Sequence, residues 1–147
     1  MLGVAVVKIV LVTGSRSWPD VASVAEVLRG ADVLLIGDCP TGADAIALEH
    51  GHAAGCMVLV FSASSKTAAR VSGIYPGVAV VEVSEWERDR KLAGPLRNKA
   101  MAKRASQYAQ DGIVPECHAF PTDDSVGTWD CVRALKELGL EATVHEP

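Results

Sequence analysis

A nearly unbroken apolar run, rich in β-branched residues, occupies residues 4–12 and leads directly into the turn TGSR at residues 13–16. Such a run is typical of a strand buried on both faces of a parallel sheet, because a half-exposed strand would alternate with polar residues. After the turn, Asp20 is placed to cap a helix, apolar residues recur at helical spacing, and Gly30 closes the segment. Residues 4–30 therefore predict one strand, one turn and one helix.

The same unit then repeats along the chain. We expect a short strand over residues 33–36, a turn-rich loop over 37–42, a helix over 43–54 and a third strand over 57–61. Short buried strands that alternate with helices are typical of a parallel sheet with right-handed crossovers. At 147 residues the chain has the size of one domain. We predict a single α/β domain over residues 1–147, with a Rossmann-like, doubly wound, mainly parallel sheet and helices on both faces.

The pattern is less regular in the second half of the chain. Residues 62–76 are rich in Ser, Thr, Ala and Gly, and they predict a loop or a poorly packed helix. A strand over residues 78–83 follows, and Pro95 stands in the first turn of a helix that continues to about Tyr108. The remaining elements that we expect are a strand, a helix and an edge strand, over residues 113–120, from 125–128 to about 138, and over 142–145.

The charge balance of the chain bears on its partners. The formal net charge is -4, so the chain lacks the basic field that drives sequence-independent binding to nucleic acid. On this ground we do not expect nucleic acid as a partner. The densest cationic stretch, residues 88–104, is interpreted as a solvated helix face, with the exception of Arg97.

The first residues and the cysteines bear on the compartment. Lys8 interrupts the apolar residues 1–12 and no small-residue cleavage site follows, so we expect neither a signal peptide nor a membrane span, and no membrane partner. The four cysteines and four histidines show no metal-ligand spacing. We therefore expect a cytoplasmic protein with reduced thiols, no metal and no cofactor.

Three loops each follow a predicted strand and precede a predicted helix, at residues 14–20, 37–44 and 121–130. Glycines let the backbone approach a ligand closely, and amides at helix starts attract anions, so these loops suit phosphate or carboxylate. One such loop is weak evidence, because a glycine in a turn commonly serves only the turn. All three emerge at one edge of a parallel sheet. Together with Arg16 and Arg97 they predict a ligand site at the topological switch point.

The segments TGSR, GDCPTGADAIA, AGPLRN, AFP and SVGTWD occur in this order along the chain. In this combination the chain resembles the SLOG superfamily, and more narrowly its YspA-like branch. This branch is related to the LOG phosphoribohydrolases and to the Rossmann-like domain of the DNA-processing protein DprA. The resemblance covers about residues 9–144. Residues 64–80 depart from it, and we interpret them as an insertion that reshapes one wall of the pocket.

The resemblance implies a nucleotide or nucleotide derivative laid across the glycine loops, with its phosphate on the last loop and the helix start. It also implies a homodimer or a higher homo-oligomer. Asp44 has an equally good interpretation as an acid in the first turn of a helix. The ligand-binding residues that the resemblance implies are Gly14, Ser15, Arg16, Gly37, Thr41, Gly42, Asp44, Arg97, Asn98, Ser125, Gly127 and Thr128.

The match to the hydrolytic relatives is incomplete. In those relatives an Arg and the Glu of a PGGxGTxxE motif are associated with cleaving the base from a nucleoside monophosphate. Arg97 resembles the Arg, but the position of the Glu falls on Cys131, one residue after Asp130. Neighbouring helical residues point about 100° apart, so the Asp130 carboxylate does not simply replace the Glu.

Binding or sensing of a nucleotide or nucleotide derivative at the carboxyl edge of the sheet is therefore our leading hypothesis. The first alternative is a LOG-like phosphoribohydrolase that cleaves an N-glycosidic bond, with Arg97 and Asp130 as its catalytic residues. The second alternative is an adaptor or DNA-interaction protein with a vestigial pocket.

Overall fold

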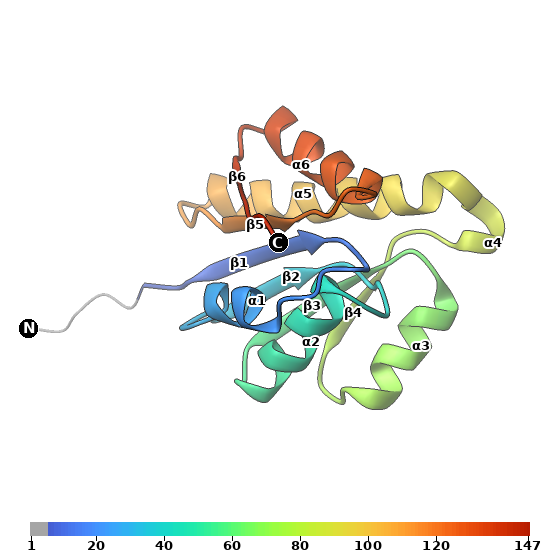
Figure 1. Cartoon of the computed structure of the whole chain (residues 1–147), viewed down its shortest axis with the longest axis horizontal. Helices are drawn as coiled ribbons and strands as arrows, with labels where there is room; N and C mark the ends of the chain where they lie inside the picture. Colours follow the sequence, from blue (N-terminus) through green and yellow to red (C-terminus); the bar gives the residue numbers. More distant parts are fainter. Residues whose placement is uncertain (1–5) are drawn as a thin grey trace, which may run out of the picture.

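A six-stranded sheet forms the centre of the computed structural model, which describes residues 6–147 (Figure 1). Its order is β4-β3-β2-β1-β5-β6, and every neighbouring pair is parallel. The start of the predicted first strand, residues 4 and 5, lies outside the described residues. The strands are β1 (Ile9–Gly14), β2 (Val33–Ile36), β3 (Met57–Ser62), β4 (Ala79–Glu82), β5 (Glu116–Phe120) and β6 (Ala142–Val144).

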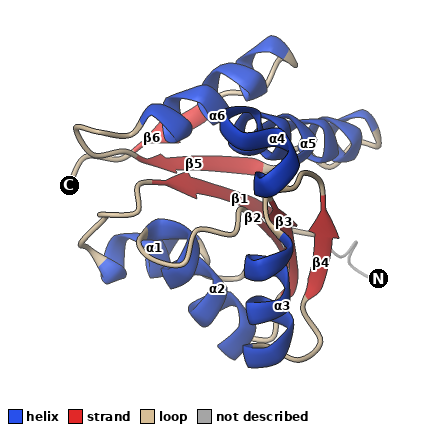
Figure 2. Ribbon diagram, turned by 90° about the vertical axis from the view of Figure 1, so that its right-hand side faces the viewer, coloured by secondary structure: helices blue, strands red, loops and turns tan. Residues whose placement is uncertain are grey.

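Helices cover both faces of the sheet, as Figures 1 and 2 show. On one face lie α1 (Val21–Val27), α2 (Ala43–Ala53) and α3 (Ser65–Ile74). On the other lie α5 (Ala93–Gln110) and α6 (Val126–Glu137), and the short helices α4 (Trp86–Asp89) and η1 (Arg90–Leu92) precede α5. The predicted Rossmann-like, doubly wound α/β fold is confirmed. None of the helices in the described residues is long and apolar enough to cross a membrane.

Two apolar cores follow from the alternation of side chains along β1. Val10 and Val12 are fully buried against α1 and α2 on one face, whereas Ile9 and Leu11 are buried against α5 and α6 on the other. Because successive side chains of a strand point to opposite faces, a strand between two helical layers has to be apolar at every position. This explains why the first apolar run of the sequence predicts a central strand.

The segment predicted as a loop or a poorly packed helix forms the ordered helix α3. Its N-cap Ser64 accepts a hydrogen bond from the amide of Lys66 at 3.2 Å, and Ala68 and Val71 are buried against the sheet. A capped start and two buried side chains are enough to hold a helix whose other residues are polar or small. Of the two alternatives predicted for this segment, the helix is confirmed and the loop is wrong.

Smaller differences concern the ends of strands. The strand predicted over residues 113–120 begins at Glu116, and Pro115, which has no amide proton to donate to a ladder, stands just before it. The strand predicted over 78–83 is β4, at one edge of the sheet.

The sheet changes its direction of growth at β1. From β1 the chain adds β2, β3 and β4 on one side, and it then returns to place β5 on the other side of β1. The loops after β1, β2 and β5 consequently meet at the carboxyl edge, where ligands bind in open α/β sheets. Any site at this edge is built from residues far apart in the sequence.

Candidate functional site

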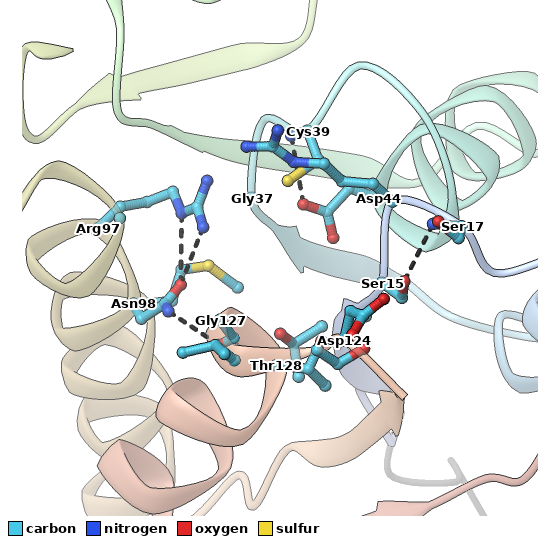
Figure 3. A pocket seen from close by; sticks show the side chains of 17 residues that line it. Ser15, Ser17, Gly37, Cys39, Asp44, Arg97, Asn98, Asp124, Gly127 and Thr128 are labelled. Carbon is cyan, nitrogen blue, oxygen red and sulfur yellow. Dashed lines mark hydrogen bonds between the residues drawn. The ribbon is translucent and has the colours of Figure 1, made fainter. Parts of the chain in front are cut away.

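A cleft of about 470 Å³ opens at the carboxyl edge beside β1 (Figure 3). Arg97 and Asn98, from α5, face Gly37, Cys39 and Asp44 across it, and the loop after β1 and the start of α6 form the remaining wall. A volume of this size suits a ligand of about nucleotide size. The lining residues are Thr13, Gly14, Ser15, Arg16, Ser17, Gly37, Cys39, Asp44, Gly94, Arg97, Asn98, Met101, Asp124, Ser125, Val126, Gly127 and Thr128.

Glycine is required at two positions of the second loop. Gly42 has φ +76°, and a Cβ atom there would overlap the carbonyl oxygen of Ser15. A Cβ atom on Gly37 would lie 2.8 Å from the carboxylate of Asp44 and 3.3 Å from the guanidinium of Arg97. The absence of a side chain at Gly42 lets two loops pack together. At Gly37 it leaves room for the charged groups of Asp44 and Arg97.

Arg97 forms an ion pair with Asp38 in the cleft wall. The Arg97 Nη1 atom donates to Asp38 Oδ1 at 2.8 Å, and the two side chains are 14% and 4% exposed. The other carboxylate oxygen of Asp38 accepts hydrogen bonds from Ser62, Thr67 and the amide of Ala63. Burial acts to raise the pKa of Asp38, but the hydrogen bond from Thr67 and the charge of Arg97 outweigh it and hold this pKa below its usual value. The Arg97 charge is therefore already balanced within the protein.

Asn98 connects this ion pair to α6. Its side-chain oxygen accepts from Arg97 Nε and Nη2, both at 3.3 Å. Its amide nitrogen donates to the carbonyl of Gly127 at 3.1 Å and to Asp130 Oδ2 at 3.0 Å. A buried amide with all of these partners fixes the distance between α5 and α6, and with it the width of the cleft.

Asp44 is the buried acid of the cleft. It lies in the first turn of α2, is 5% exposed, and accepts a hydrogen bond from the amide of Cys39 at 3.3 Å. Burial raises the pKa of this carboxyl to about 6, against the opposing charge of Arg97. Its charge therefore changes close to neutral pH.

The cysteines near the cleft remain protonated at neutral pH. Burial, followed by the charge of Asp44, raises the pKa of Cys39 to about 11, and burial raises that of Cys131 to about 12. A thiol with such a pKa is a poor nucleophile and a poor metal ligand. Cys131 is thus an inert, buried thiol.

The start of α6 opens into the cleft without a side-chain cap. The hydroxyl of Ser125, at the N-cap, accepts from the amide of Thr122 at 2.6 Å instead of capping the helix. By contrast, Asp20 caps α1 and Ser64 caps α3 through their side chains. The first amides of a helix have no acceptor within the helix. Those of α6 are therefore available to an anion in the cleft.

Most of the predicted site residues lie together in the cleft wall. Thr41, Gly42 and Asp130 do not line it. Thr41 donates its hydroxyl to the carbonyl of Arg16 at 3.0 Å, and Gly42 packs under the same loop. Asp130 accepts from Asn98 and pairs with Arg133 at 3.8 Å, outside the lining. The predicted residues found in the wall are Gly14, Ser15, Arg16, Gly37, Asp44, Arg97, Asn98, Ser125, Gly127 and Thr128.

Sequence reasoning did not single out Asp38 and Cys39. Asp38 follows a buried strand closely, in the second glycine loop. This position is the one feature of the sequence from which a site residue could have been predicted there. Its partner Arg97 is 59 residues away, so the ion pair is visible only once the fold is known.

No protein-family model matches the chain. It is 30% identical over 131 residues to the Gene 61 protein of Mycobacterium phage D29, and the match covers 89% of this chain and 90% of the phage protein. The chain belongs to the family of this phage protein. The region shared with the phage relative is long enough to include the strands and helices that form the cleft.

A solved structure, DNA processing protein A (DprA) from Streptococcus pneumoniae, has the same fold. Its TM-score is 0.56 at 19% identity, and the match covers 94% of this chain. The chain spans 58% of the length of that DprA chain. The likeness to DprA supports the predicted relationship at the level of the fold, whereas membership of the YspA-like branch stays a prediction.

The comparisons correct one expectation about partners. We did not expect nucleic acid, because the net charge is -4. The likeness to a DNA processing protein, together with the phage relative, contradicts this expectation. The physical reason is that net charge sums over the whole surface and does not describe the local field at any one edge.

Proposed function

We propose that this protein binds single-stranded DNA at the carboxyl edge of its sheet, with one nucleotide in the cleft and its phosphate on the start of α6. The observation that carries this proposal is the uncapped start of α6, which opens into a cleft of nucleotide size. The fold of a DNA processing protein supports the same conclusion.

The shape of the cleft favours a single strand over a duplex. A base in a duplex is paired and stacked, so it does not enter an enclosed pocket unless it is extruded. A single strand presents unstacked bases and a free backbone, and both fit a groove of loops and helix starts. A cleft of about 470 Å³ therefore suits one nucleotide of a single strand.

Arg16 is the cation that we expect to contact the DNA backbone beside the cleft. The Arg97 guanidinium is held by Asp38 and Asn98, so its charge is compensated before any ligand arrives. Arg16 is exposed and lines the cleft. Replacing Arg16 tests binding more directly than replacing Arg97. Removing Arg97 would leave the charge of Asp38 buried without its partner, which would also destabilise the fold.

Fluorescence anisotropy of a labelled single-stranded oligodeoxynucleotide tests this proposal. At about 50 mM salt we expect saturable binding that weakens as salt is raised, because phosphate contacts release counterions. The Arg16→Ala variant should bind several-fold more weakly. Arg29→Ala is the matched control, because Arg29 is also exposed but follows α1 near the amino ends of the strands, paired with Glu26.

Two results would reject the proposal. One is the absence of binding to single-stranded DNA at low salt. The other is an equal loss of affinity in the Arg16 and Arg29 variants, which would show that only general charge is at work.

A free nucleotide or nucleotide derivative is the second candidate ligand, and the volume of the cleft favours it. A thermal-shift panel of mononucleotides, cyclic nucleotides and nucleotide sugars separates the two. Saturation with a specific small ligand raises the free energy of unfolding by about 2.7 kcal/mol at 100 times its dissociation constant.

The order of the glycine motifs supports placing the chain in the SLOG superfamily, as part of the same proposal. The expected self-association stays a prediction.

A further inference from the structure

A second cavity, of about 420 Å³, lies next to the cleft at the same edge of the sheet. The loop after β2, the turn between β3 and α3, and the start of α4 form its walls. Arg16 and Cys39 line both cavities. The two hollows therefore adjoin at these residues, side by side along the carboxyl edge.

Trp86 supplies an aromatic surface in this second cavity. It is the first residue of α4 and lines the cavity, and it remains 50% exposed. Leaving half of an indole in water forgoes the free energy that burial of apolar surface provides. Aromatic side chains along a groove stack on successive bases in proteins that bind single strands.

The charged groups around Trp86 are of both signs, and the acids among them have partners within the protein. Glu85 accepts a hydrogen bond from the amide of Ser65 at 2.9 Å, and Glu87 pairs with Arg90 at 3.6 Å. Lys66 is exposed and lines the cavity opposite these acids. Arg16 stands where the two cavities join, at the place where a strand running through both would carry a phosphate.

We propose that the second cavity is a base-stacking subsite, in which Trp86 stacks on the base next to the nucleotide held in the cleft and Arg16 binds the phosphate between them. This inference rests on the proposed binding of single-stranded DNA. It adds that the protein recognises at least two consecutive nucleotides.

Isothermal titration of the full chain with thymidine 5′-monophosphate and with a 5′-phosphorylated thymidine dinucleotide tests this subsite. We expect the wild type to bind the dinucleotide roughly tenfold more tightly, since stacking one base on an aromatic side chain has an effect of this order. Trp86→Ala should lose this gain, and Trp86→Phe should keep most of it.

Trp129→Ala is the matched control. Trp129 is 43% exposed but does not line either cavity, so its removal should leave the gain unchanged. The melting temperature of each variant verifies that it is folded. A dinucleotide gain that persists in Trp86→Ala would overturn the subsite and leave the cleft intact. Equal affinity of the wild type for the two compounds would also overturn the subsite and leave the cleft intact. If neither compound bound, both the subsite and the proposed binding of single-stranded DNA would be overturned.

Discussion

At the scale of single residues, two buried acids at the cleft have pKa values shifted in opposite directions. Asp38 has a pKa below its usual value, because the hydrogen bond from Thr67 and the charge of Arg97 outweigh its burial. Asp44 has a pKa raised to about 6, because burial outweighs the charge of Arg97. The first acid balances the guanidinium. The second adds a negative charge to the cleft, which Asp124 also lines, once the pH rises above about 6.

Replacement of Asp44 should change the pH dependence of stability. Its pKa in the folded state, about 6, lies above the usual 3.8, so the folded protein holds this proton more tightly. The resulting stabilisation is complete in acid and is lost as the pH rises through about 6. The Asp44→Asn variant has no such titrating group. Its free energy of unfolding, relative to that of the wild type, should therefore rise by up to about 3 kcal/mol as the pH is raised from 3.8 to about 6.

Urea unfolding of both proteins at about pH 4 and about pH 8 measures this difference. A difference that stays constant between the two conditions would show that Asp44 keeps an ordinary pKa. The same variant should bind single-stranded DNA more tightly than the wild type at about pH 8, because the carboxylate no longer repels the phosphate.

At the scale of elements, the starts of the helices divide into two kinds. Those of α1 and α3 are closed by the side chains of Asp20 and Ser64, whereas those of α2, α4, α5 and α6 have no side-chain cap. The start of α6 lines the cleft. An uncapped start lowers the stability of a helix by about 1 kcal/mol relative to a good cap. Its retention beside the cleft is consistent with the binding of an anion there.

Gly127→Ala should stabilise the protein and weaken its binding of DNA. Gly127 lies in the first turn of α6 and lines the cleft, and an added Cβ atom would meet nothing within 4 Å. Alanine favours a helix over glycine by about 1 kcal/mol, so the melting temperature should rise. The added methyl group would narrow the access of a phosphate to the helix start.

Gly73→Ala provides the comparison for this variant. Gly73 lies near the end of α3, and an added Cβ atom there also has open space. It should raise the melting temperature by a similar amount without any effect on DNA binding. Unchanged DNA binding in Gly127→Ala would contradict the proposed place of the phosphate.

At the scale of the whole molecule, the sequence predicted the architecture better than the details of the site. The alternation of buried strands and helices identifies the sheet, because a strand between two helical layers must be apolar throughout. The ion pair of Asp38 and Arg97 escaped prediction, since its partners are 59 residues apart. Helix α3 was predicted only as one of two alternatives, because its cap and two buried residues give little periodicity in a polar segment.

The second glycine loop also shows what a sequence alone does not predict about the site. Gly42 looks like a ligand-binding glycine in the sequence, and its positive φ and its close approach to Ser15 give a structural reason for glycine at this position. Net charge was a poor guide to partners, because it does not describe how charges are distributed over one edge. These properties depend on tertiary contacts, which a single sequence does not specify.

Backbone amide chemical shifts of the isotopically labelled protein, titrated with a 5′-phosphorylated single-stranded oligodeoxynucleotide, test the central claim most directly. We predict that the largest changes fall on the first-turn amides of α6, at Val126, Gly127 and Thr128, because these are the donors to the phosphate. Changes confined to the amino edge of the sheet, or an absence of any change at saturating oligonucleotide, would contradict the account.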